Sequence, residues 1–255
     1  MLPEGDYYVD AWLRGYGQEA GHVHLGVNAD ETITLRLPEG DVPQGMVLVP
    51  GGPFTMGEDG RTPDERPRRE VVLEPYYIDK YETTNAEFQR VFPALRFPEG
   101  RGHFPVTGVT WRQASAYATA VGKRLPTEEE WEKAARGSDG REYPWGNTFS
   151  PEVCNVLESD YGAPTPVGAH LEGLSPAACA DMAGNAMEWT EGWYRAYPGN
   201  DLMSEDFGQV CRVLRGGSYR EAAVDARCAR RHFDRPDSAR EDYGFRCAKS
   251  FSDKE

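Results

Sequence analysis

The sequence lacks features that would place it in several well-defined classes of protein. Its five cysteines are an odd number without any C-x-x-C spacing, so they predict neither a zinc site nor a complete disulfide framework. No segment approaches the roughly 20 apolar residues that a membrane helix needs, and no basic segment followed by an apolar one opens the chain. We therefore expect no membrane insertion.

Basic residues are few. The chain has 28 lysines and arginines against 42 acidic residues, which gives a formal charge of −14. This charge repels polyanions, so we expect cations rather than nucleic acid as partners. A hydrophobic content of 39% with 11% aromatic residues indicates a globular chain, and 28 glycines with 19 prolines predict a fold rich in loops.

Common catalytic motifs are also missing. The nucleophile elbow G-x-S-x-G, the zinc motif H-E-x-x-H and the phosphate loop do not occur. The run "EEEWE" at 128–132 could provide paired acid and base groups, but acidic residues also suit the first turn of a helix, and we interpret them as structural. His22 and His24 would share one face of a strand, but no third metal ligand is visible, which favours a solvated edge strand.

The first part of the chain predicts a small β segment. Residues 5–38 contain runs with alternating apolar positions, ending with "ETITLRL". The acidic, proline-bearing "LPEGDVPQG" at 37–45 predicts a linker. We therefore divide the chain into an N-terminal β segment with its linker over 1–42 and a second domain over 43–252.

Three helices of the second domain are predicted by their first residues. In a capping box, a threonine and a Glu or Gln three residues later satisfy free amides at the helix start. The pairs are Thr84 with Glu87, Thr110 with Gln113, and Thr127 with Glu130. Gly122 and Gly137 stand where helix C-terminal caps belong.

The pattern of the second helix predicts a buried face. Apolar residues recur there at helical spacing: Ala114, Tyr117, Ala118 and Val121. After residue 137 the sequence predicts short strands joined by glycine turns. Helices in the first half and short strands in the second indicate an α+β fold.

The segment "DMAGNAMEWT" at 181–190 is a candidate cation site. Asp181 and Glu188 provide carboxylates, and Gly184 and Ala186 could point backbone carbonyls the same way in a curled loop. Calcium takes six to eight such oxygens at about 2.3–2.6 Å. Spacing alone favours an ordinary glycine turn in which the two carboxylates cap backbone amides.

Six segments together resemble a known family. They are "MVLVPGGPFTMG", "VTGVTWRQASAYATAVGKRLPTEEEWEKAARG", "YPWGN", "GNAMEWT", "LRGGSY" and "YGFRCA". In this order and spacing they resemble the formylglycine-generating enzymes, whose sulfatase-modifying-factor domains have a fold related to C-type lectins. The resemblance covers roughly residues 43–250 and implies a loop-rich α+β fold of this kind.

The resemblance also implies calcium. One ion would bind the turn through Asp181, Gly184, Ala186 and Glu188. A second would bind around Asn155 and Val156 with a later carboxylate such as Asp160, although the spacing between "CNV" and "TPVG" departs from the family pattern.

The catalytic cysteines of the family are not at their places. Its oxygen-dependent enzymes bind copper(I) through two cysteines just after "GGSY", but positions 220–227 contain no cysteine. Cys228 and Cys247 resemble structural cysteines of the family, and alanines, Ala118 and Ala135, stand where their disulfide partners would be. We therefore expect buried free thiols and no formylglycine generation. Met187 replaces a tryptophan of the enzymes' substrate groove.

These departures favour a calcium-stabilised pseudoenzyme that binds a protein or a small molecule. Arginine and aromatic residues, which are enriched at recognition hot spots, follow the "GGSY" turn. The predicted ligand-binding residues are Met187, Ser218, Tyr219, Arg220, Arg231, His232, Phe233, Asp234 and Tyr243. The alternatives are a packed surface loop without a ligand, or a metal-dependent oxidoreductase of the formylglycine-generating or sulfoxide-synthase type.

The resemblance extends to domain context. Similar domains are fused to bacterial protein kinases and envelope proteins, and residues 5–38 resemble the tail of a β-sandwich repeat in such chains. This implies the sensor or adaptor part of a larger bacterial protein. Calcium favours an extracytoplasmic location and unpaired cysteines favour the cytoplasm.

Overall fold

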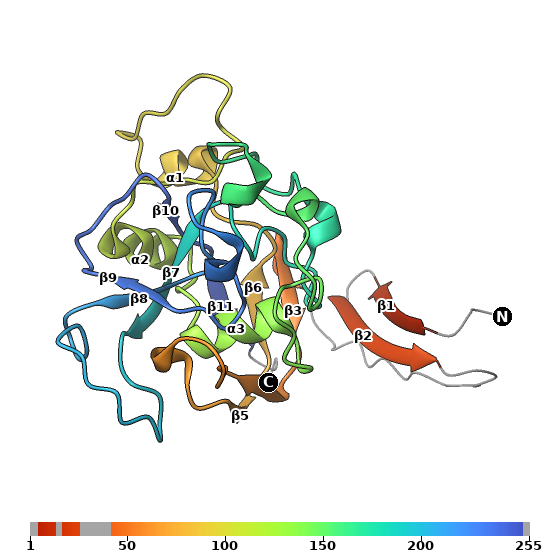
Figure 1. The fold of residues 1–255 in the computed structure, drawn as a ribbon. Helices are drawn as coiled ribbons and strands as arrows, with labels where there is room; N and C mark the ends of the chain where they lie inside the picture. The colour runs from red at the N-terminus through yellow and green to blue at the C-terminus, as the bar shows by residue number, and fades with distance from the viewer. Residues whose placement is uncertain (1–4, 14–16, 26–41, 252–255) are drawn as a thin grey trace.

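The computed structural model describes residues 5–13, 17–25 and 42–251, and Figure 1 shows their arrangement. β1 (Gly5–Leu13) and β2 (Gly17–Leu25) form an antiparallel hairpin within the predicted N-terminal β segment. His22 and His24 belong to β2. The predicted strand at 31–37 and most of the predicted linker lie outside the described residues.

Short strands build the second half of the fold and part of the first. A four-stranded sheet has the order β10–β7–β8–β9, a three-stranded sheet has the order β11–β6–β3, and β4 pairs with β5. The β10–β7 pair is parallel and the other pairs are antiparallel. The strand bounds are β3 (Met46–Val49), β4 (Gly52–Met56), β5 (Arg69–Leu73), β6 (Tyr76–Asp79), β7 (Met187–Trp193), β8 (Arg212–Arg215), β9 (His232–Asp234), β10 (Tyr243–Gly244) and β11 (Ala248–Ser250).

The three predicted helices are present. They are α1 (Asn85–Val91), α2 (Trp111–Ala120) and α3 (Glu128–Arg136), and each begins with both reciprocal hydrogen bonds of its capping box. Gly122 and Gly137 follow α2 and α3 with φ of 70° and 67°, as a helix C-terminus requires. The short 3₁₀ turns are η1 (Pro63–Glu65), η2 (Pro151–Val153), η3 (Leu157–Ser159), η4 (Leu171–Gly173) and η5 (Ala223–Asp225). The α+β prediction is confirmed.

One residue of the predicted buried face is misplaced. Ala114, Tyr117 and Ala118 are buried, but the exposed fraction of Val121 is 37%. α2 ends at Ala120, so Val121 is the C-cap residue and leaves the helical periodicity.

Helix α3 lies at the centre of the domain. It contacts β4 and β5 on one side and β7 and β8 on the other (Figure 1). Trp131 of α3 and Trp189 of β7 have no exposed surface. This central position explains why most side chains of α3 are buried, including charged ones.

The acidic run of α3 is structural, as we expected. Arg215 binds Glu128 at 3.0 Å and Glu132 at 2.5 Å, and Arg231 binds Glu128 at 2.7 Å. Arg136 binds Glu132 at 2.8 Å. Burial alone would raise the pKa of Glu128, but the guanidiniums of Arg231 and Arg215 hold that pKa below its usual value. The buried carboxylates of Glu128 and Glu132 are therefore both paired with arginines.

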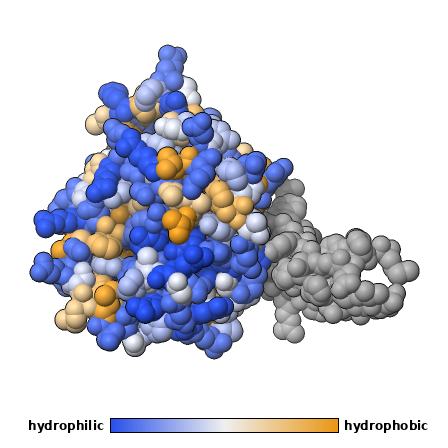
Figure 2. Space-filling model, viewed as in Figure 1, coloured by the Kyte–Doolittle hydropathy of each residue, from blue (hydrophilic) through white to orange (hydrophobic). Residues whose placement is uncertain are grey.

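The face of the domain drawn in Figure 2 is mainly polar. Figure 2 shows a hydrophilic face with separate hydrophobic residues, and none of the helices within the described ranges is long and apolar enough to cross a membrane.

Replacing Arg215 by Met should destabilise the protein by about 3–5 kcal/mol, because two carboxylates would lose a buried partner. Urea denaturation measures this change. Arg112→Met is the matched control, since Arg112 and Asp237 are 66% and 73% exposed and their pair contributes about 0–1 kcal/mol. Equal effects of the two substitutions would contradict the structural role of the buried pairs.

Candidate calcium loop and adjoining groove

The loop before β7 is tightly curled. Asp181, Gly184 and Asn185 have φ of 58°, 86° and 61°, in the left-handed region that few side chains tolerate. A Cβ at Gly184 would lie 2.1 Å from the carbonyl oxygen of Asn155, so only glycine fits there. The loop therefore packs directly against the segment predicted to hold the second cation.

Glu188 is bound on both of its carboxylate oxygens. Arg246 donates from Nη2 to Oε1 and from Nε to Oε2, both at 2.7 Å, and Trp131 Nε1 donates to Oε2 at 2.8 Å. Asp181 Oδ2 accepts a hydrogen bond from the backbone N–H of Gly168 at 2.6 Å. A cation bound by Glu188 would share this carboxylate with Arg246.

Sequence spacing did not identify a third buried carboxylate, that of Glu82. Its Oε1 accepts from Ala186 N–H at 3.0 Å and its Oε2 from Asn185 Nδ2 at 2.7 Å. Burial and the negative charges of Asp181 and Glu188 raise the pKa of Glu82 well above its usual value. Burial also raises the pKa of Asp181. The loop is thus an acidic site, which a cation would stabilise.

The predicted second site is partly assembled. Asn155 and Val156 are buried, and Asn155 Nδ2 donates to Ala163 O at 3.0 Å and to Asn185 Oδ1 at 3.1 Å. Asn155 Oδ1 is buried without any hydrogen-bond partner. Buried acceptors are seldom left unpaired, so this oxygen is available to a cation. Asp160, in contrast, is exposed at the end of η3.

Side chains alone do not form a metal site. In the part of the chain that the structure describes, no three His, Cys, Asp or Glu side chains are grouped to hold a metal ion. A cation at either position would therefore depend on carbonyl and amide oxygens, which suits calcium better than a transition metal.

Five predicted ligand-binding residues are buried and cannot form a surface face: Met187, Ser218, Tyr219, Arg231 and Tyr243. Met187 packs with Trp189 and Tyr243 in the hydrophobic core. Ser218 donates to Asp242 Oδ2 at 2.8 Å. Arg231 contributes to the ion pairs of α3 instead. An arginine-rich loop sequence does not reveal which of its arginines has a buried partner.

The other four predicted ligand-binding residues are at least partly accessible. Arg220 pairs with exposed Glu241 at 2.6 Å, and Phe233 is 37% exposed and stacks on Tyr194. Asp234 is partly buried and accepts a hydrogen bond from the hydroxyl of Tyr243. His232 Nε2 lies 2.9 Å from Asp225 O, and burial lowers the pKa of His232 to about 4.

All five cysteines are free, buried thiols, which confirms the prediction made for Cys228 and Cys247. Cys247 packs in the same cluster as Ala118, and Cys228 in the same cluster as Ala135. Burial raises the pKa of Cys228 to about 12 and also raises that of Cys247, so both stay protonated. Protonated thiols are poor nucleophiles and poor metal ligands.

Comparison with known proteins decides the family. Residues 36–251 match the family described as "Sulfatase-modifying factor enzyme 1-like domain". The chain belongs to this family.

Two relatives differ in how much of their length the chain spans. It is 35% identical over 238 residues to serine/threonine-protein kinase pkn1 of Chlamydia caviae. The matched region covers 80% of this chain but only 38% of the kinase. It is 33% identical over 275 residues to "Inactive C-alpha-formylglycine-generating enzyme 2" of Mus musculus, which covers 80% of this chain and 85% of that protein.

A solved structure has the same fold as the present chain, which is a member of the sulfatase-modifying-factor family. Treponema denticola variable protein 1 superposes with a TM-score of 0.70 at 22% sequence identity, covering 80% of this chain and 94% of that chain. The C-type-lectin-like fold predicted from the sequence is thereby confirmed.

The low pKa of His232 should make the protein less stable in mild acid. The unfolded chain takes up this proton below pH 6.5, whereas the folded chain does so near pH 4. The contribution of His232 to the free energy of unfolding is present above pH 6.5 and is lost as pH falls. It decreases by about 2 kcal/mol between pH 7 and pH 5. Urea denaturation at both pH values should show this loss to be smaller in His232→Gln. Equal losses in both proteins would show that His232 does not contribute.

Proposed function

We propose that this chain is a non-catalytic, calcium-stabilised binding module of the sulfatase-modifying-factor family and part of a larger bacterial protein. The observation that carries the proposal is an intact family fold without thiols at 220–227. The two cysteines that follow, Cys228 and Cys247, have no exposed surface. Soft ligands for copper(I) are therefore missing from the expected place.

Calcium fits the oxygen donors of the loop. The candidate ligands are Asp181, Glu188 and the carbonyls of Gly184 and Ala186, with Asn155 Oδ1 and the carbonyl of Val156 at a second position. A bound divalent ion would supply positive charge next to three buried carboxylates. The raised pKa values of Glu82 and Asp181 arise chiefly from burial, and a bound cation would stabilise the charged forms of these carboxylates.

The proposed binding face lies at the loop that replaces the cysteine pair. The loop is tied to η3, since Leu157 N–H donates to Glu221 O at 2.9 Å and Ala223 N–H to Glu158 Oε2 at 2.9 Å. Leu157 and Val224 are 59% and 49% exposed on these two adjoining turns. Exposed aliphatic residues beside Arg220 are typical of protein-binding surfaces.

The named relatives support a non-catalytic role as part of a larger protein. One is a protein kinase of which this chain matches a part, and another carries the word inactive in its name. A sensor or adaptor domain that recognises a protein ligand is consistent with both.

Chelation should lower the melting temperature. Calcium at 100 times its Kd stabilises the folded state by about 2.7 kcal/mol, which corresponds to about 5–10 °C for a domain of this size. Thermal unfolding with calcium or with EGTA measures the difference, and Glu188→Gln should reduce it.

The matched control for this experiment is Glu65→Gln. Glu65 is equally buried and pairs with Arg227 at 2.8 Å, so its loss also breaks an ion pair but leaves the loop intact. It should keep the full response to EGTA. An unchanged wild-type midpoint in EGTA would refute calcium binding.

We also expect no oxygen-dependent chemistry. With copper(I), air and a cysteine-containing peptide, oxygen uptake should equal that of a protein-free sample, because the thiol pair is absent. A formylglycine-generating enzyme that has both cysteines serves as the positive control. Stoichiometric copper together with peptide oxidation would overturn the proposal in favour of an enzyme.

A further inference from the structure

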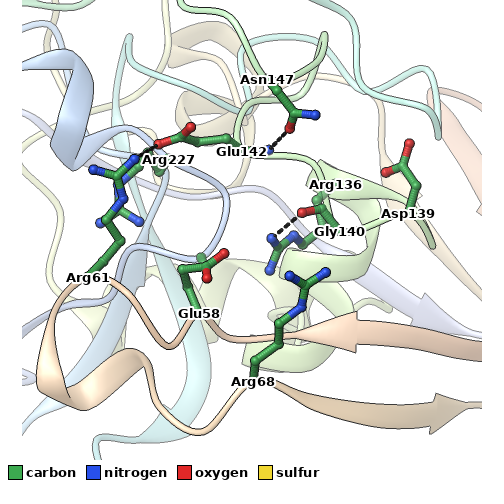
Figure 3. Close-up of a pocket in the computed structure, with 10 residues that line it drawn as sticks. Glu58, Arg61, Arg68, Arg136, Asp139, Gly140, Glu142, Asn147 and Arg227 are labelled. Carbon is green, nitrogen blue, oxygen red and sulfur yellow. Dashed lines mark hydrogen bonds and ion pairs between the residues drawn. The ribbon is translucent and has the colours of Figure 1, made fainter.

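A charged pocket lies apart from the candidate calcium loop and the proposed binding face. It has a volume of about 390 Å³ and is formed by the segments around Glu58, Arg68, Gly140 and Arg227 (Figure 3). None of the residues predicted for the calcium loop or the ligand-binding face lines it. Its size falls within the range of sites for small molecules.

Two of its arginines are fixed by buried partners. Arg136 binds Glu132 at 2.8 Å, and Arg227 binds both oxygens of Glu65 at 2.8 and 3.0 Å. The exposed fractions of Arg136 and Arg227 are 1% and 2%. These guanidiniums are rigid, and their charges are already compensated.

Arg68 has no such partner. Within the described residues its guanidinium makes no hydrogen bond and no ion pair, and a Cβ at Gly140 would lie 3.0 Å from its Nη2. Arg136 Nη2 donates to Gly140 O at 2.6 Å. Two guanidiniums thus converge at Gly140, and one of them lacks a counter-ion. This arrangement favours an anionic group between them.

The pocket also has an uncompensated carboxylate. Arg61 pairs with Glu142 at 2.6 Å and Asp139 with Arg141 at 2.7 Å. Glu58 accepts a hydrogen bond from Asp59 N–H but forms no ion pair among the described residues. Figure 3 shows Glu58 projecting into the space that Arg61 and Arg68 flank. One cation and one anion therefore line the same cavity without contacting each other.

A ligand with two opposite charges would complement both groups at once. A simple anion would be attracted by Arg68 but repelled by Glu58. A simple cation would be attracted by Glu58 but repelled by Arg68. We propose that this pocket binds a small zwitterion of the α-amino acid class, with its carboxylate at Arg68 and Arg136 and its ammonium group at Glu58. This site is independent of the proposed calcium-stabilised binding function.

Calorimetric titration of the full chain tests the proposal. The probes are L-alanine, L-serine and L-glutamine, with acetate, inorganic phosphate and ethylamine as ligands that carry charge of one sign only. At least one amino acid should bind with a Kd below about 1 mM, and each ligand with charge of one sign should bind at least tenfold more weakly.

Substitutions locate the site. Arg68→Gln and Glu58→Gln should each weaken amino-acid binding at least tenfold, whereas Arg112→Gln, at an exposed pair elsewhere, should leave it unchanged. Arg68 is exposed and Glu58 partly exposed, so both variants should keep the wild-type melting temperature. Phosphate binding that equals amino-acid binding and survives Glu58→Gln would indicate an anion site and overturn the proposal. Absence of amino-acid binding up to about 10 mM would also overturn it.

Discussion

The carboxylate of Glu188 joins three parts of the fold. It lies on β7, accepts from Trp131 of α3 and pairs with Arg246, whose guanidinium also donates to the carbonyls of Lys80 and Ala180. Removing a charged pair from water is costly, and such a pair persists only when further hydrogen bonds satisfy both partners. Here every contact of the pair links segments distant in sequence. The candidate calcium loop is held between them.

The pairing of Arg246 with Glu188 leaves the loop with surplus negative charge. Arg246 binds Glu188, while Glu82 and Asp181 remain buried nearby with raised pKa values. A protein can tolerate such a surplus by protonating one carboxylate or by binding a cation. Gly184 brings the loop against Asn155, so the two candidate positions adjoin each other.

Sequence predicted the parts of the structure that depend on local chemistry. The capping boxes at Thr84, Thr110 and Thr127 formed as expected, since each joins residues three apart. The ordered family motifs predicted the fold. The partners of Arg231 and the position of Glu82 were not predictable, because each interaction spans about a hundred residues. The charged pocket was missed for the same reason.

The loss of the family's cysteine chemistry did not require another covalent link. Ala118 and Ala135 fill the positions beside Cys247 and Cys228, so small apolar groups pack where the resemblance implies disulfides. The buried ion pairs of α3 instead link this helix to Arg215 of β8. Unlike a disulfide, these links act in the folded state and do not restrict the unfolded chain. Their stability does not depend on the redox state of the surroundings.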